Sequence, residues 1–253
     1  MKDYVALARS YEADVLAGRI PAGKWVRLAC ERSQRDHARA EPLYRRALGI
    51  RERKLGPEHT DTAMTLNSLA LLYHAQVDHE RAAPLFARAL AIFKHNLGPE
   101  DPLVALSSNN LAELYRARGD YARAEPLYQR ALAILEKALG PDHADVAASL
   151  NNLALLYQVR GKYAQAEPLF MRSVAIYERV FGQNHPAFAK ALSNLGALYF
   201  AMGDYGRAES FCQRSLSSLE RGLGRDHPDI VGVLNSLATI YNTRGDHARA
   251  EPL

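Results

Sequence analysis

A period of 42 residues runs through most of the chain and constrains its fold more than any other feature of the sequence. The segment LNNLALLY ends at Tyr157, and related segments end at Tyr73, Tyr115, Tyr199 and Tyr241. A second block in the same register, close to AEPLYQRAL, begins at Ala40, Ala82, Ala124, Ala166, Ala208 and Ala250. Such self-similarity predicts stacked supersecondary units, each of which covers its apolar face with its neighbours.

Each repeat predicts two helices. Leu150, Leu153 and Tyr157 have the i, i+3, i+7 spacing of one helix face, and they mark the segment that we call helix A. Small residues next to this leucine column, such as Ala154 and Gly196, predict a close approach of helix A to the following helix. That following helix, helix B, has a similar apolar stripe, which in one repeat consists of Leu127, Ala131, Ile134 and Leu135.

Glycine and aspartate mark the predicted helix boundaries. In the turn RGDY, residues 118–121, the glycine suits the left-handed conformation that ends helix A, and the aspartate suits the N-cap of helix B. The loop LGPDH, residues 139–143, stops helix B at its glycine, and helix A restarts at or near Pro102, Pro186 or Pro228. A proline early in helix B lacks a backbone donor and predicts a bend or a delayed helix start, at Pro42, Pro84, Pro126, Pro168 and Pro252.

Composition and charge agree with packed helices and disfavour several functions. Hydrophobic residues make up 48% of the chain and charged residues 24%. The 32 Lys and Arg are nearly balanced by 28 Asp and Glu without a basic block, so nucleic-acid binding is not favoured. The first residues lack the apolar segment of a secretory signal, and nowhere do 18 apolar residues run together. We therefore expect a soluble cytoplasmic protein without membrane contact.

Residues that could suggest chemistry lack the spacing that chemistry needs. Cys30 and Cys212 are far apart and have no ligand-like neighbours. The segment GRIPAGK, residues 18–24, resembles a phosphate loop but is followed by Trp25 where Ser or Thr is required. One loop histidine recurs per repeat, and because zinc needs three or four converging ligands, we expect helix capping and loop packing from His59, His143, His185 and His227. We expect no catalytic residue, no metal and no cofactor.

With these motifs the chain resembles the tetratricopeptide repeat superfamily, in the 42-residue form found in kinesin light chains and in many bacterial proteins. The resemblance covers residues 36–253 and rests on LNNLALLY, RGKYAQAEPLF and LGPDHADVA recurring in register. It implies an all-α fold, a right-handed α-solenoid of antiparallel helix hairpins whose concave groove, lined mainly by helix A, receives peptides or partner proteins. The expected units are a partial repeat at 36–59 that supplies helix B, repeats at 60–101, 102–143, 144–185 and 186–227, and a truncated repeat at 228–253.

The predicted groove residues lie in three columns of helix A. The resemblance implies that asparagines of the first column, Asn67, Asn109, Asn151 and Asn235, pair with the backbone of an extended peptide, since an amide offers a donor and an acceptor. The alternative is that these amides bond neighbouring helices or face water. The other two columns vary more and would supply specificity through Leu71, Glu113, Leu155, His74, Arg116, Gln158, Phe200 and Asn242. They contain no cluster of Lys and Arg, which favours a neutral, partly apolar peptide.

The two ends depart from the repeat. Residues 1–35 are expected to form a helical cap, and DVLAGRIPAGKWVRLACER within them resembles the N-terminus of phage terminase large subunits. No motor domain and no nuclease carboxylates accompany that segment, so we infer no packaging activity. At the other end the chain stops early in a helix B. The last helix A then lacks its cover, which predicts partial exposure of Leu234, Leu237 and Tyr241. Such exposure would either lead to self-association through this repeat or indicate a truncated gene product.

The sequence therefore predicts a non-catalytic scaffold that binds a peptide or a partner protein in the groove. The alternative is the sensor or regulatory array of a larger bacterial signalling enzyme, which an effector domain in the adjacent reading frame would reveal. A third interpretation, DNA packaging inherited from the N-terminus, predicts salt-dependent DNA binding that is lost when residues 1–35 are deleted.

Overall fold

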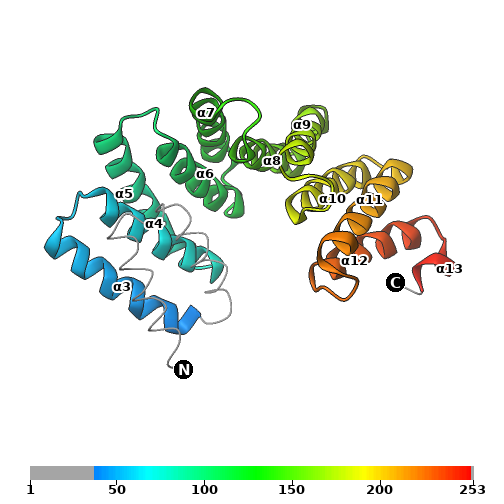
Figure 1. Ribbon diagram of the computed structural model, residues 1–253, viewed down its shortest axis with the longest axis horizontal. Helices are drawn as coiled ribbons and strands as arrows, with labels where there is room; N and C mark the ends of the chain where they lie inside the picture. The colour runs from blue at the N-terminus through cyan, green and yellow to red at the C-terminus, as the bar shows by residue number, and fades with distance from the viewer. Residues whose placement is uncertain (1–36, 252–253) are drawn as a thin grey trace. The chain divides into compact units, whose positions relative to one another are not determined.

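The computed structural model describes residues 37–251, which form eleven helices and no strand (Figure 1). These residues belong to two compact units, the first ending at Arg118 and the second beginning at Gly119, which we call unit 1 and unit 2. The predicted N-terminal cap with its terminase-like segment, the GRIPAGK segment, Cys30 and Pro252 lie outside the described residues. The all-α fold predicted from the sequence is confirmed in both units.

Unit 1 contains two neighbouring copies of helix A and two of helix B. The helix A copies are α4 (Thr60–Ala75) and α6 (Pro102–Ala117), and the helix B copies are α3 (His37–Lys54) and α5 (His79–Leu97). Each helix packs against the next along the chain, and α4 also contacts α6 directly. The side chains of successive helix A copies can therefore meet.

Unit 2 continues the same alternation. Helix B is represented by α7 (Tyr121–Leu139), α9 (Tyr163–Phe181), α11 (Tyr205–Leu223) and the short α13 (His247–Ala250). Helix A is represented by α8 (Ala144–Val159), α10 (Pro186–Ala201) and α12 (Asp229–Thr243). As in unit 1, consecutive helix A copies touch, α8 with α10 and α10 with α12.

The small-residue column lets helix A approach helix B, as predicted. In the α8–α9 hairpin, Ala154 and the large Phe170 are both fully buried. At the matching positions of the α10–α11 hairpin the chain has Gly196 and Cys212, and a Cβ on Gly196 would lie 2.8 Å from Cys212 Sγ. A smaller residue on each helix therefore replaces the Ala–Phe combination. Burial also raises the pKa of the Cys212 thiol to about 11, so this cysteine stays protonated and unreactive.

A tyrosine at the end of helix A ties each of several repeats to the helix B before it. The hydroxyl donates to a glutamate 32 positions earlier, for example from Tyr157 to Glu125 at 3.1 Å and from Tyr199 to Glu167 at 2.6 Å. The same bond joins Tyr73 to Glu41 and Tyr241 to Glu209. These bonds cross from one repeat to the next and fix the register between neighbouring hairpins.

The helix boundaries follow the predicted glycine and aspartate signals. Gly161 and Gly203 have φ values of 69° and 78° and end helix A in the left-handed conformation. Asp120 and Asp204 cap the next helix by accepting from the backbone N–H three residues on, at 3.2 and 2.9 Å. The predicted capping role of the loop histidines is also confirmed, because His143 Nδ1 accepts from the backbone N–H of Asp145 at 3.2 Å.

Of the predicted bend or delayed start of helix B at its proline, the delayed start is wrong. Helix α5 begins at His79 and runs through Pro84, and α3, α7 and α9 likewise contain a proline in their first half. Pro84, Pro126 and Pro168 are all exposed. The carbonyl that loses its partner lies on the same outer side, where water can satisfy it, so the helix tolerates the residue.

The prediction of exposure in the last helix A is wrong for two of its three residues. Leu237 and Tyr241 are buried, because they lie on the face of α12 that packs against α11. Leu234 is half-buried and Val231 is 55% exposed. Their counterparts one and two repeats earlier face a complete helix B, whereas the described part of α13 is four residues long. Self-association through this face stays a prediction.

Val77 is the one non-glycine residue with positive φ among residues 37–251, at 62°. It stands where the other turns have Gly119, Gly161, Gly203 and Gly245. A β-branched side chain is strained in this conformation. Because Val77 is 73% exposed, packing of its side chain offsets little of this strain. Within the described residues this turn is therefore a strained joint between two well-packed helices.

We expect Val77→Gly to raise the free energy of unfolding by about 0.5–1 kcal/mol, since relief of left-handed strain outweighs the entropy of glycine. Urea denaturation followed by circular dichroism measures the change. The matched control is Gly161→Val, which should lower stability. A Val77→Gly protein that is no more stable than the parent would show that the turn carries no strain.

We expect His143→Ala to destabilise the protein by about 1 kcal/mol through loss of the N-cap of α8. His143→Asp should be nearly neutral, because the chain already uses Asp101 at the equivalent position, where it accepts from the Leu103 N–H at 2.8 Å. Denaturant midpoints of the two variants give the comparison. Equal losses in both would mean that the imidazole acts through packing and not as a cap.

Candidate functional site

The predicted groove residues of unit 1 lie on α4 and α6, which touch one another. Asn67 and Asn109 are only 9% and 8% exposed. The residues of the two variable columns are more open, since Leu71, His74, Glu113 and Arg116 are all half-exposed. The structure therefore brings these residues together on one surface, with the asparagines at its base.

The asparagines of successive helix A copies hydrogen-bond to one another. Asn110 Nδ2 donates to Asn67 Oδ1 at 3.1 Å in unit 1, and Asn194 Nδ2 donates to Asn151 Oδ1 at 2.8 Å in unit 2. These are the bonds of the alternative interpretation, in which the amides join neighbouring helices. An amide whose oxygen is engaged in this way offers a ligand mainly its N–H groups.

A charged pair occupies the variable columns on α6. Arg116 Nε donates to Glu113 Oε2 at 2.8 Å, and a second guanidinium nitrogen donates to the other carboxylate oxygen at 2.5 Å. Both side chains are about one quarter to one third exposed. A two-bond pair of this kind holds its geometry, so the surface presents a neutralised charge at this place.

Two histidines flank the strained turn of unit 1. His74 is a residue of the variable column and lies near the end of α4, and His79 is the first residue of α5. The centroids of the two imidazole rings are 5.3 Å apart. The Nδ1 atoms of both rings are buried and have no hydrogen-bond partner. Burial lowers the pKa of His74, an effect that the nearby Glu113 opposes.

The corresponding surface of unit 2 is neutral and more apolar. Leu155, Gln158 and Phe200 are half-exposed on α8 and α10, and the Phe200 ring lies 5.4 Å from the ring of Tyr205. On α12, the predicted Asn235 and Asn242 are exposed. Of the asparagines in the first column, Asn235 is thus the most accessible to a ligand.

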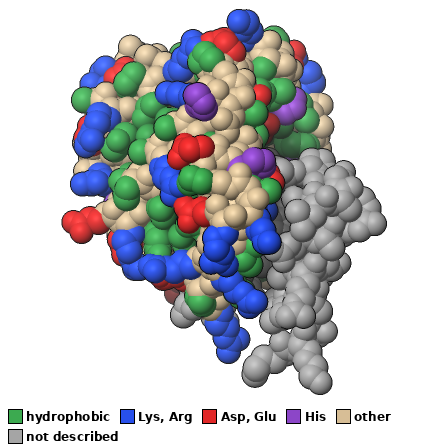
Figure 2. Space-filling view, turned by 90° about the vertical axis from the view of Figure 1, so that its left-hand side faces the viewer, with side chains coloured by type: hydrophobic (Ala, Val, Ile, Leu, Met, Phe, Trp, Pro, Cys, Tyr) green, Lys and Arg blue, Asp and Glu red, His purple; other side chains and the backbone are tan. Residues whose placement is uncertain are grey.

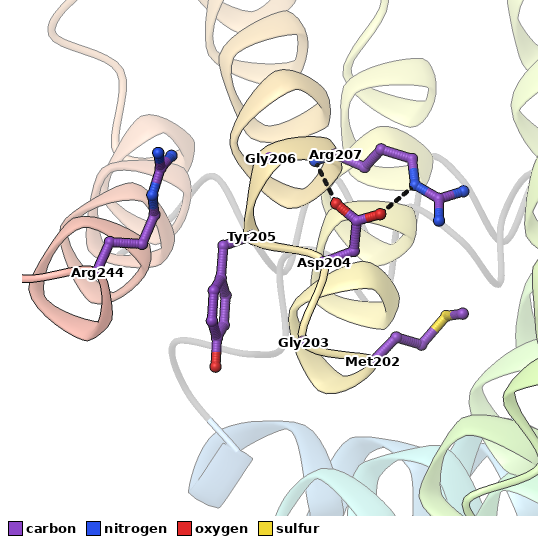
Figure 3. A pocket seen from close by; sticks show the side chains of 7 residues that line it. All are labelled: Met202, Gly203, Asp204, Tyr205, Gly206, Arg207 and Arg244. Atoms are coloured by element: carbon purple, nitrogen blue, oxygen red, sulfur yellow. Dashed lines mark hydrogen bonds and ion pairs between the residues drawn. The ribbon is translucent and has the colours of Figure 1, made fainter.

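An open pocket of about 590 Å³ lies beside this surface in unit 2 (Figure 3). It is formed by the α10–α11 turn, residues 202–207, together with Arg244 after α12. Its charged groups are paired within the protein, because Arg207 Nε donates to Asp204 at 2.5 Å and Arg244 donates to Glu209 at 2.6 Å. The pocket is therefore a polar recess whose ionic partners are already satisfied.

Sequence reasoning missed the residues that begin helix B. His79 and Tyr205 each contact a predicted groove residue, yet the predicted groove residues were all placed on helix A. The sequence did contain a signal, because the first residue of helix B varies between repeats and lies beside a varied column on helix A. In chain order these first residues are His79, Tyr121, Tyr163, Tyr205 and His247.

The described residues give little support for other classes of site. Between residues 37 and 251, no group of three or more His, Cys, Asp or Glu side chains could hold a metal ion. In the same part of the chain no helix is both long and apolar enough to cross a membrane. Figure 2 shows a face on which Lys and Arg lie among Asp, Glu and hydrophobic side chains.

We expect the Asn151–Asn194 bond to stabilise the free protein. A double-mutant cycle with Asn151→Ala and Asn194→Ala should show a coupling of about 0.5–1.5 kcal/mol in urea denaturation. The control cycle pairs Asn151→Ala with Asn235→Ala, which should be additive. A coupling of zero in the first cycle would show that the bond does not stabilise the free protein, and the amides would then be available to a ligand.

The sequence and the fold were compared with those of known proteins. The family model of the tetratricopeptide repeat matches residues 29–95, 103–179, 145–211 and 187–253. No curated protein matches the chain.

Similar solved structures are repeat proteins of the kinesin light chain type. The crystal structure of BtubC (BKLC) from P. vanneervenii is 26% identical, covers 88% of this chain and 87% of its own, and has a TM-score of 0.68. The crystal structure of the nearly identical TPR-like repeats of a putative kinesin light chain from Podosopora anserina is also 26% identical, covers 77% of this chain and 92% of its own, and has a TM-score of 0.66. The chain therefore belongs to the tetratricopeptide repeat family, and its stacked helix hairpins are the scaffold on which this family binds other proteins.

Proposed function

We propose that the chain binds an extended peptide or a partner protein in the concave groove lined by helix A, without catalysing a reaction, and that it does so in the cytoplasm. One observation carries the proposal. Positions that pack one helix on another repeat almost unchanged, whereas an open column of helix A reads His74, Arg116, Gln158, Phe200 and Asn242. Variation in an open column of an otherwise regular array is what selective binding requires.

The chemistry of the two units supports two kinds of contact with a ligand. In unit 2, Leu155 and Phe200 provide apolar area, and Gln158 adds a neutral hydrogen-bonding group. In unit 1, the charges of Arg116 and Glu113 neutralise one another. An apolar peptide segment therefore suits the surface of unit 2, and a polar segment suits the surface of unit 1.

The asparagines contribute unequally to this binding. Asn235 is exposed and can offer both its donor and its acceptor to a peptide backbone. The oxygens of Asn67 and Asn151 already accept from the next helix, so these amides would contribute N–H groups, and Asn109 is buried at the base of the surface. We therefore assign the main specificity to the variable columns and a supporting role to the amides.

The regulatory-array alternative uses the same surface and differs only in what is joined to the array. Both functions require that the groove bind a partner. A catalytic or signalling domain encoded next to this chain would favour the alternative.

We expect peptides selected by display against the purified chain to lose binding when the variable column is changed. Phe200→Ala should weaken the Kd about tenfold or more, because an aromatic anchor in a contact surface is a common hot spot. The matched control is Met171→Ala on α9, since Met171 is also a large apolar residue and is 52% exposed, but lies on helix B.

Fluorescence anisotropy gives the two affinities, and unchanged melting temperatures confirm that both variants fold. If Met171→Ala weakens binding and Phe200→Ala does not, the ligand sits on helix B and the groove proposal is wrong. Selected peptides that bind parent and both variants equally would also contradict it.

A further inference from the structure

The contact between His74 and His79 is peculiar to one repeat. Their rings lie 5.3 Å apart across the turn that contains the strained Val77, and both Nδ1 atoms are buried without a hydrogen-bond partner. At the same two positions the other repeats have the combinations Arg116 with Tyr121, Gln158 with Tyr163, Phe200 with Tyr205, and Asn242 with His247. Among the turns between residues 37 and 251, only this one therefore places two imidazoles against each other.

Protonation does not suit this arrangement. A neutral imidazole carries one N–H and one lone pair, whereas an imidazolium carries two N–H donors and a positive charge. The added proton would place a donor at a buried Nδ1 that has no acceptor, and two cationic rings at this distance would repel one another. The contact as it stands requires neutral rings.

The charged groups around the pair come from three helices. On α6, Glu113 and Arg116 both act on His74, and they are bonded to each other. On α5, Asp78 precedes His79 and is occupied as the N-cap that accepts from the Arg81 N–H. On α3, Glu41 and Arg45 engage the hydroxyl of Tyr73. Of these groups, Glu113 is the anion that acts on His74.

We propose that the contact between His74 and His79 forms a proton-sensitive joint in unit 1, closed while His74 is neutral and opened when protonation of His74 separates the rings and draws Glu113 away from Arg116. The left-handed Val77 between them offers little resistance, because its backbone is already strained. A second consequence rests on the proposed function. Opening of the joint would make binding in the groove pH-dependent, because it frees Arg116 for a carboxylate of the partner.

The direction of the pH effect follows from the environment of His74. Burial lowers its pKa in the folded protein, with smaller lowering effects from His79 and Arg116 and an opposing effect from Glu113. The unfolded chain then takes up a proton more readily than the folded chain does. Stability is full above the ordinary histidine pKa of about 6.5 and is lost as the pH falls from there toward the lowered value.

The test uses the whole chain and needs no partner, so it stands apart from the test of peptide binding. The double variant His74→Gln, His79→Tyr copies the Gln158–Tyr163 combination that the chain already accommodates. Between pH 7.5 and pH 5.5 we expect the parent to lose about 2–4 °C more in melting temperature than the double variant. His95→Gln, which removes an exposed histidine from the same α5, should retain the loss of the parent.

Equal losses in the parent and the double variant would overturn the proposal. Histidine titration by nuclear magnetic resonance provides a second readout that simple destabilisation does not move. Glu113→Gln should lower the pKa of His74 further, and Arg116→Gln should raise it. A His74 resonance that titrates identically in all three proteins would show that the rings do not sense this environment.

Discussion

A hairpin of two amphipathic helices cannot cover its own apolar faces, and every regularity of this chain follows from that constraint. The small column of helix A and the large side chains of helix B close each hairpin, as Ala154 and Phe170 do. The bond from Tyr199 to Glu167 then joins one hairpin to the hairpin before it. These contacts occupy the same positions in successive repeats, so only the open columns of helix A and the start of helix B are free to differ.

Much of this fold could be predicted because its signals are local. A glycine with positive φ, an aspartate or histidine cap and a 42-residue period each depend on residues close in sequence. The two wrong predictions, on the prolines and on the last helix A, concerned the direction in which a side chain faces. Pro84 was expected to disturb α5, but its solvent-facing side makes the lost bond tolerable. Leu237 was expected to be open, but it belongs to the face that packs on the preceding helix.

The binding surface was less predictable than the fold, because its chemistry depends on groups about one repeat apart. Nothing near Asn67 in the sequence shows that its oxygen accepts from Asn110, a residue 43 positions later. Periodicity gave the column but could not say whether an amide faces a ligand or the next helix. The same limit applies to His79, whose part in the surface depends on how closely α5 begins beside the end of α4.

The matched sizes of Gly196 and Cys212 limit which helices can be exchanged between repeats of this array. A helix A taken from another repeat would bring alanine to the position of Gly196, where its methyl group would meet the sulfur at 2.8 Å. A helix B taken from another repeat would bring Phe or Tyr to the position of Cys212. The exchange of helix A alone would therefore create a clash, whereas exchange of the complete α10–α11 hairpin would not separate Gly196 from Cys212. In this repeat the two helices are best moved as one unit, while the repeats that combine alanine with Phe or Tyr share one pairing.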